Sequence, residues 1–212
     1  MDFILWWLRM KVVRFPIIAA DLFTTNVGTD EQRQELLAEA LTHRNANQDT
    51  MAFSNEGCWR SQFQYKNIDW LTEHLRNLTN TAIDYYIETD NAFSKKVKFF
   101  GDARVKYWTN VNEPKSKNSL HVHGLHHFVG IYYIQGYDTG DLVFHNPSNL
   151  TETCNPYTPF VSRTAWPPKN GDLLLWPGWM PHETEINLSD KQRVNIAFNV
   201  RFETPQMIYD DN

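Results

Sequence analysis

The feature that most constrains the fold is a run of short alternating segments after about Val97. Apolar and polar residues alternate with a period of two, and turns with Pro, Gly or Asn separate the segments. The segments read VKYWTNVN, LHVHG, FVGIYYIQG, DLVFHNP, DLLLWPG, HETEINL and RVNIAFNVRF. About seven strands in roughly a hundred residues predict an antiparallel β-sandwich or barrel.

The first hundred residues are expected to be mostly helical. Residues 29–32, TDEQ, have the form of a capping box, and a second helix from about Asn67 carries a continuous apolar stripe. Residues 50–64 are interpreted as a loop that packs Trp59, and the apolar residues 3–8 as an edge strand or a packed arm. These helices could cover one face of the sheet.

Length and composition favour a single domain. The chain has 212 residues and a hydrophobic content of 42%, which suit one folded unit with a proper core. We therefore expect one mainly β domain over residues 1–212, with helical support over about 1–95 and a β core over about 97–203.

Charge and cysteine use narrow the function classes. The formal net charge of −5 leaves no global basic footprint for nucleic acid. The apolar run at residues 3–8 is too short to span a membrane and lacks the flanks of a signal peptide. Cys58 and Cys154 form no CxxC pattern, so reduced thiols and a cytoplasmic location are expected.

Four of the eight histidines lie in HVHGLHH, residues 121–127. Residues two apart on a strand share a face, so His121 and His123 point the same way, and Leu120 and Val122 point to the other side. Neutral imidazole is a common metal ligand, and a cation between the two rings would relieve their repulsion. A half-exposed polar face without metal is the alternative.

A third metal ligand has to come from elsewhere in the chain, and His182 is the best candidate. It follows a Pro-Gly turn in GDLLLWPGWMPHETEI, where a hairpin would bring it back over the first strand. The remaining histidines of this region are expected to be structural or to lie on a rim: His126, His127 and His145.

The last alternating segment has two distinct faces. Val194, Ile196, Phe198, Val200 and Phe202 form an apolar face, and the other face carries Arg193, Asn195, Ala197, Asn199 and Arg201. If the polar face lines the inside of a barrel, Arg193 offers a planar fork for a carboxylate, with Asn195 beside it. A solvated edge strand is the alternative.

Taken together, these motifs resemble those of the Fe(II)/2-oxoglutarate-dependent oxygenases, which have a double-stranded β-helix (jelly-roll, cupin-like) core. The match is closer to a small group of such oxygenases in bacteria and phages. The similar motifs are WTNVN, HVHGLHHFVGIYYIQ, LVFHNP, the closing GDLLLWPGWMPHETEI and RVNIAFN, and the upstream NEGCWRSQ. The resemblance covers roughly residues 12–203.

The resemblance implies a site and a reaction. His121, His123 and His182 would hold Fe(II), and Arg193, assisted by Asn195 and the Tyr133 hydroxyl, would bind the distal carboxylate of 2-oxoglutarate. The reaction would hydroxylate an unidentified substrate, a protein or peptide side chain or a small molecule, with O2 consumed and succinate and CO2 released. The location would be the cytoplasm, the host's if the protein is viral. The substrate side would be lined by residues of the preceding strand, namely Trp108, Asn110 and Asn112. For Trp108, a position in the core is an equally open interpretation.

Two positions depart from the pattern of these oxygenases. His123 stands where Asp or Glu is usual, and Asn195 stands where Ser is usual. Asp141 is the main competitor of His123 as a ligand, although its place after a Gly favours a turn residue. Two other functions stay open: a cupin-like metal enzyme that does not use 2-oxoglutarate, and a jelly-roll binding or structural module.

Overall fold

The computed structural model describes residues 5–7, 10–17, 20–48, 50, 53–64, 66–89, 97–100, 104–147, 163–202 and 204–207. Two helices lie within them, α1 (Asp30–Ala46) and α2 (Asp69–Thr89). The strands of the described residues are β1 (Leu5–Trp7), β2 (Met10–Ile17), β3 (Ala20–Asn26), β4 (Asn55–Arg60), β5 (Val97–Phe100), β6 (Arg104–His121), β7 (Phe128–Gln135), β8 (Leu142–His145), β9 (Arg163–Trp166), β10 (Asp172–Pro177), β11 (His182–Thr184), β12 (Arg193–Arg201) and β13 (Thr204–Met207).

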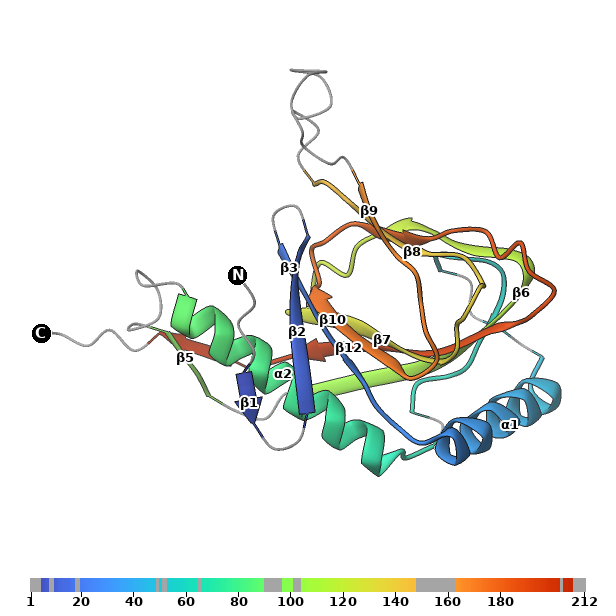
Figure 1. Ribbon diagram of the computed structural model, residues 1–212, viewed down its shortest axis with the longest axis horizontal. Helices are drawn as coiled ribbons and strands as arrows, with labels where there is room; N and C mark the ends of the chain where they lie inside the picture. The colour runs from blue at the N-terminus through green and yellow to red at the C-terminus, as the bar shows by residue number, and fades with distance from the viewer. Residues whose placement is uncertain are drawn as a thin grey trace, which may run out of the picture.

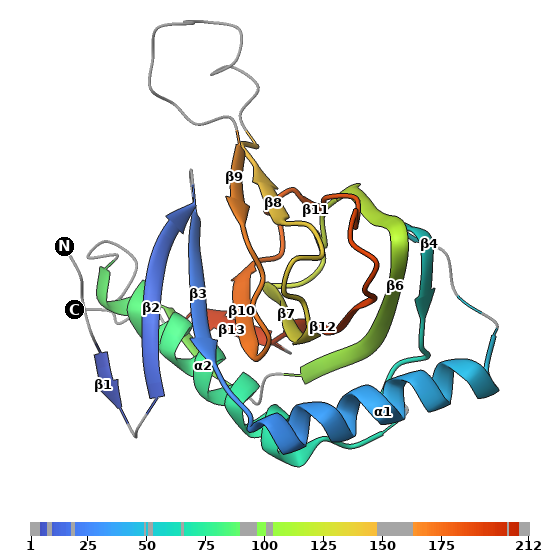
Figure 2. The same ribbon diagram turned by 45° about the vertical axis from the view of Figure 1, so that its right-hand side comes forward.

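Most strands belong to one curled antiparallel sheet. Its order is β1-β2-β3-β10-β7-β12-β6-β11-β8-β9, and β4 also pairs with β6, while β5 and β13 form a separate pair. The long strand β6 belongs to both halves of the sheet, because it pairs with β12 along its first part and with β11 near its end. Figures 1 and 2 show β6 as a long curved strand at which the sheet curls around toward its other half. The prediction of a mainly β barrel with packed helices is confirmed.

The two faces of β12 separate the apolar core from the barrel interior. The face that carries Val194, Ile196, Phe198 and Val200 packs in a core cluster together with buried residues of both helices. The opposite face supplies Asn195, Ala197 and Asn199 to an internal cavity. Since β12 lies between β7 and β6, the predicted core face is confirmed, and the solvated edge strand is excluded.

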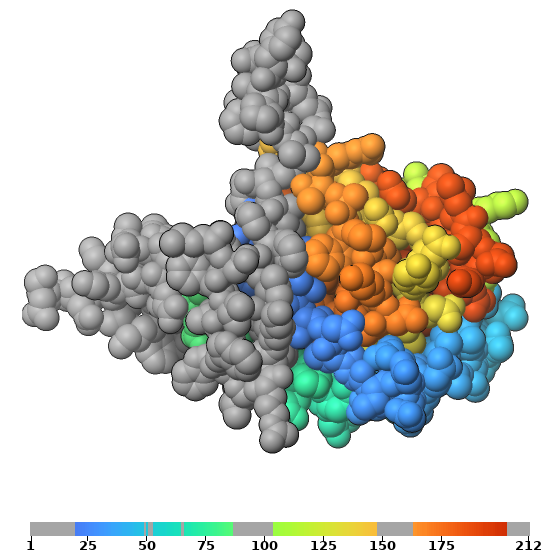
Figure 3. Space-filling model, in the orientation of Figure 1, coloured from blue at the N-terminus to red at the C-terminus, as the bar shows by residue number. Residues whose placement is uncertain are grey.

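Both helices cover the outer face of the sheet. At the start of α1, the Thr29 hydroxyl accepts from the Gln32 N–H, and the Gln32 side chain accepts from the Thr29 N–H, which is the predicted capping box. The helix α2 buries an apolar stripe of Leu71, Leu75, Leu78 and Ala82. Burial of each leucine contributes roughly 1.5–3 kcal/mol. Figure 3 shows α1, in blue, against the strands of the second half of the chain.

The expectation of a mostly helical first hundred residues is wrong over several segments. The strands β1, β2, β3 and β4 lie there, with β1 as the edge strand that residues 3–8 allowed. The segment NEGCWR was interpreted as loop because it lacks alternation. It is a strand because β6 offers it an edge, with Trp59 opposite Val111. Trp59 is buried as expected, and its Nε1 donates to Asn47 O at 2.6 Å.

The predicted hairpin before His182 is also wrong. The strand β10 pairs with β3 and β7, whereas β11 pairs with β6 and β8. The chain crosses between the two halves of the barrel at Gly178, which donates to His127 O at 3.1 Å and accepts from His123 N at 2.8 Å. Gly178 still lies in a tight turn, because Met180 N donates to Pro177 O at 3.0 Å, but the strands on either side of this turn do not pair with each other. The bonds of Gly178 tie the crossing to the histidine-rich segment.

Neither described helix is long and apolar enough to cross a membrane. Cys58 is a buried free thiol, and Cys154 lies outside the described residues.

Candidate metal centre

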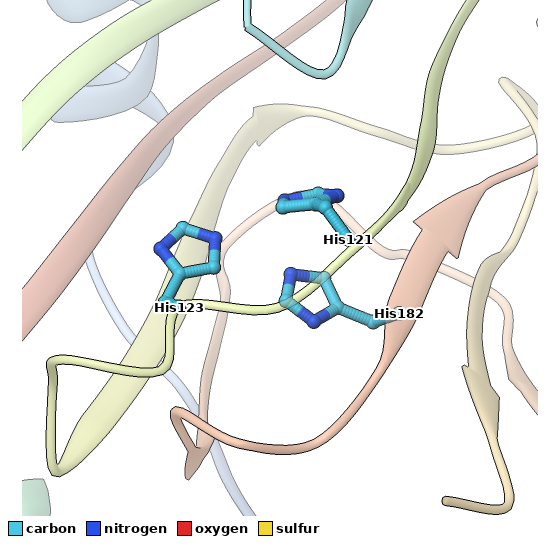
Figure 4. A group of neighbouring side chains, drawn as sticks. All are labelled: His121, His123 and His182. Atoms are coloured by element: carbon cyan, nitrogen blue, oxygen red, sulfur yellow. The ribbon is translucent and has the colours of Figure 1, made fainter.

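Three histidines converge in the barrel. His121 is the last residue of β6 and His182 the first of β11, and the pairing of these strands sets the two residues opposite each other. His123 lies two residues beyond β6. One ring nitrogen of each lies within 4.8 Å of the others, and Figure 4 shows the rings grouped around a common space. The structure thus brings together the three residues that the sequence singled out.

In each ring, Nδ1 lies within hydrogen-bond distance of an oxygen. The acceptors are Ser119 O for His121 (2.7 Å), Asn199 Oδ1 for His123 (2.8 Å) and Met180 O for His182 (2.8 Å). An oxygen that accepts from Nδ1 places the hydrogen there and leaves the Nε2 lone pair free. Such partners orient histidines that bind metals.

The three rings are electrically neutral near pH 7. Burial lowers the pKa of His121, and burial together with the neighbouring His121 lowers the pKa of His123 to about 4. Burial also holds the pKa of His182 well below its usual value. Because only the neutral ring has a lone pair to give, the low pKa values favour metal binding over protonation.

No carboxylate joins this cluster within the part of the chain that the structure describes. Asp141 neither belongs to it nor lines the cavity above it, and its N–H donates to the Glu185 carboxylate at 3.3 Å. The donor set is therefore three imidazoles, which suits Fe(II) and several other divalent transition metals.

A cavity of about 700 Å³ opens over the three histidines. Asn195, Ala197 and Asn199 of β12 form part of its wall. Trp108 and Asn110 line it as the sequence predicted. Asn112 does not, because its Nδ2 donates to Asn118 Oδ1 and to Cys58 Sγ, each at 2.9 Å.

Arg193 is fully buried and lies behind the cavity wall. Its Nη1 donates to Thr139 O at 2.7 Å, and its Nη2 donates to Thr184 Oγ1, a cavity residue, at 2.8 Å. Its Nε has no hydrogen-bond acceptor among the described residues. A buried guanidinium with an open N–H and no carboxylate beside it is suited to an anion.

Tyr133 lies near this guanidinium. Its hydroxyl is buried without a hydrogen-bond partner among the described residues. Burial raises the pKa of Tyr133, and the charge of Arg193 opposes this change. Asn195 lines the cavity, and its Oδ1 accepts from Asn110 Nδ2 at 2.9 Å. The residues predicted to bind one carboxylate therefore lie at or behind one wall.

The other histidines of this region lie apart from the cluster. His126 lines the cavity rim, the Nδ1 of His127 accepts from Phe202 N at 3.2 Å, and His145 pairs with Glu183 at 2.8 Å. Three further residues of the site were not predicted from the sequence: Asn199 contacts His123, Thr184 contacts Arg193, and Arg60 lines the cavity. The polar face of β12 was the one signal for Asn199.

Residues 106–199 match the sequence model of a family described as "Putative 2OG-Fe(II) oxygenase". The matched part includes the three histidines and Arg193. No curated protein matches the chain in sequence.

Solved structures of similar shape come from several organisms. A prolyl-4-hydroxylase of Pseudomonas putida is 13% identical with a TM-score of 0.58, covering 86% of this chain and 93% of that one. HygX from Streptomyces hygroscopicus, with nickel and 2-oxoglutarate bound, is 12% identical with a TM-score of 0.54, covering 86% of this chain and 83% of that one. A prolyl hydroxylase from Trichoplax adhaerens, in complex with a hypoxia inducible factor peptide fragment, is 14% identical with a TM-score of 0.53. The match covers 86% of this chain and 84% of that one. At these identities the likeness concerns the fold, and it confirms the predicted double-stranded β-helix.

Proposed function

We propose that the chain is a 2OG-Fe(II) oxygenase, the family whose sequence model matches residues 106–199, and that His121, His123 and His182 are the ligands of its iron. The observation that carries this assignment is the oxygen that lies beside the Nδ1 of each ring. Each Nδ1 is held by an oxygen, so that the three Nε2 lone pairs are left for one ion at the cavity.

Iron bound there, with 2-oxoglutarate and O2, supplies the oxidising power that hydroxylates a substrate carbon and releases succinate and CO2. The protein's own residues bind and orient the reactants. Three neutral ligands leave coordination positions open for the cosubstrate. The cavity above the histidines holds the substrate.

We assign the distal carboxylate of 2-oxoglutarate to Arg193, assisted by Asn195 and Tyr133. The open Nε of Arg193 and the unpartnered Tyr133 hydroxyl are donors that a carboxylate would satisfy. Thr184 lies between Arg193 and the cavity, so a carboxylate has to reach past it.

The substrate is proposed to be a protein or peptide side chain or a small molecule. The cavity is large enough for either a side chain or a small organic molecule. The Trichoplax structure shows that a related fold accepts a peptide. We also propose that residues 1–212 act as one domain in the cytoplasm, because β3 pairs with β10 in the barrel and Cys58 is a free thiol.

A cupin-like enzyme without 2-oxoglutarate is the second candidate, since three histidines suit it equally well. Anaerobic addition of Fe(II) and then 2-oxoglutarate separates the two. A visible charge-transfer band that needs both components supports the proposal, and succinate should form once air is admitted. Iron binding with neither band nor succinate favours the cupin-like enzyme. Absence of iron binding favours a binding module and removes the metal assignment.

A further inference from the structure

A second arginine lies in the same cavity, on a different strand from Arg193. Arg60 is the last residue of β4 and is only 6% exposed. Aromatic rings surround its guanidinium, with the carbon Cζ 4.4 Å from the Trp108 ring centroid, 4.5 Å from that of Phe53 and 5.0 Å from that of Phe63. The rings contact the guanidinium but offer no hydrogen-bond acceptor to the N–H groups that point outward in its plane.

Two of the three guanidinium nitrogens of Arg60 lack partners in the part of the chain that the structure describes. Its Nε and Nη1 are buried and have no hydrogen-bond acceptor among the described residues. The described residues that line the cavity include no Asp, Glu or Lys, so Arg60 is their one permanent charge. Burial lowers the pKa of Arg60, yet an arginine stays protonated in proteins. A buried charge without a partner is costly, and an anion that enters the cavity would relieve that cost.

Arg60 lies near the metal ligands. Trp108, which contacts its guanidinium, stacks on His123 with ring centroids 6.3 Å apart and planes 15° apart. Arg193 by contrast is the first residue of β12 and lies behind Thr184, which lines the cavity. The cosubstrate carboxylate is thus assigned to an arginine behind the cavity wall, and Arg60 is a separate cation that lines the cavity itself.

The mouth of the cavity is apolar. Five large hydrophobic side chains that line it are 45–83% exposed, namely Phe53, Phe63, Leu120, Val122 and Leu125. Exposed apolar side chains gathered at a cavity mark a binding surface. A ligand that satisfies both features has an anionic group and an apolar body.

We propose that Arg60 determines substrate specificity by binding a carboxylate or phosphate group of the substrate, whose aromatic or aliphatic body packs on the apolar mouth. The inference rests on the proposed function in that it takes this cavity as the substrate site. It does not depend on turnover, because the anion site is built from β4 and β6 residues that are present without metal.

The test measures binding to the metal-free full chain by calorimetry. The probes are benzoate, 3-phenylpropanoate and phenyl phosphate, with benzamide and 3-phenylpropanamide as neutral counterparts. We expect at least one anion to bind tenfold or more tightly than the neutral probes, and Arg60→Gln to abolish that preference. Arg76→Gln, at an exposed position of α2, is the matched control and should leave it intact. The preferred anion tells carboxylate from phosphate.

Equal binding of anions and amides by the wild-type protein would overturn the proposal, as would an unchanged preference in Arg60→Gln. Arg60→Lys keeps the charge and should retain part of the preference, which excludes misfolding as the cause of a loss. The affinity of the iron-loaded protein for 2-oxoglutarate should not change in Arg60→Gln. If it falls at least tenfold, Arg60 anchors the cosubstrate and the specificity assignment is wrong. Failure of succinate formation with an intact anion preference would count against the proposed function alone.

Discussion

His123 occupies the position at which oxygenases of this kind usually carry a carboxylate, so its substitution separates two assignments of the metal site. We expect His123→Ala to lose most bound iron, because two histidines hold Fe(II) weakly, and His123→Asp to retain part of it. Asp141→Asn should change little. Iron per chain after desalting is the measurement. The three-histidine assignment fails if Asp141→Asn strips the metal while His123→Ala keeps it.

Arg193→Ala should weaken the binding of 2-oxoglutarate and leave iron bound. Loss of one partner of a buried charge pair costs on the order of 2–5 kcal/mol, which is roughly thirty-fold or more in affinity. Calorimetry with the iron-loaded variant measures its affinity for 2-oxoglutarate, and the iron content serves as the control for folding. An unchanged 2-oxoglutarate affinity would show that Arg193 only ties together the carbonyls that it contacts, such as Thr139 O.

Sequence spacing could reveal the ligands but few of the groups that orient them. His121 and His123 are visible as a pair because residues two apart share a strand face. Asn199 lies 76 residues from His123, so no local pattern links them. The acceptors for the other two rings are main-chain carbonyls, which any residue supplies. Arg60 was hidden for the same reason, since its aromatic partners Phe53 and Trp108 come from separate segments.

A strand could be predicted where its own alternation of apolar and polar residues sets its place, and not where pairing with a distant strand sets it. The strand β12 was predicted correctly because it is amphipathic, and one face packs in the core while the other lines the cavity. The strand β4 was missed because its conformation comes from pairing with β6. The pairing of β10 and β11 was predicted wrongly, because the Pro-Gly turn forms but each of these strands finds other partners in the sheet. The position of His182 opposite His121 survives this error because it depends on β6.

Gly130 in the middle of β7 is a sharp test of element packing. A Cβ there would overlap Leu174 O and the Phe198 ring, which fill the space beside the glycine. Gly130→Ala should therefore lower the free energy of unfolding by roughly 1–3 kcal/mol or more. Urea unfolding of the metal-free protein measures it. The control is Gly124→Ala, whose Cβ meets nothing within 4 Å and should leave the midpoint nearly unchanged. Equal midpoints for the two variants would contradict this packing.

At the scale of the whole molecule, ligand binding and stability are linked. Metal that binds the folded chain at a hundredfold excess over its Kd adds about 2.7 kcal/mol to the free energy of unfolding. A thermal scan should show a higher Tm with Fe(II) under anaerobic conditions, and a chelator should reverse the rise. The same rise in a variant with His121, His123 and His182 all replaced by Ala would place the ion elsewhere.

The position of β12 also governs how the protein is made. This strand lies between β7 and β6 in the middle of the sheet, yet it is synthesised after both of them. Until β12 has left the ribosome, both neighbours present open edges, and the face of the barrel that carries Asn199 does not exist. Strand pairings between distant segments form slowly and leave intermediates that are prone to aggregation. A nascent chain of this protein should therefore be a chaperone client, and iron should enter only after synthesis has passed residue 201.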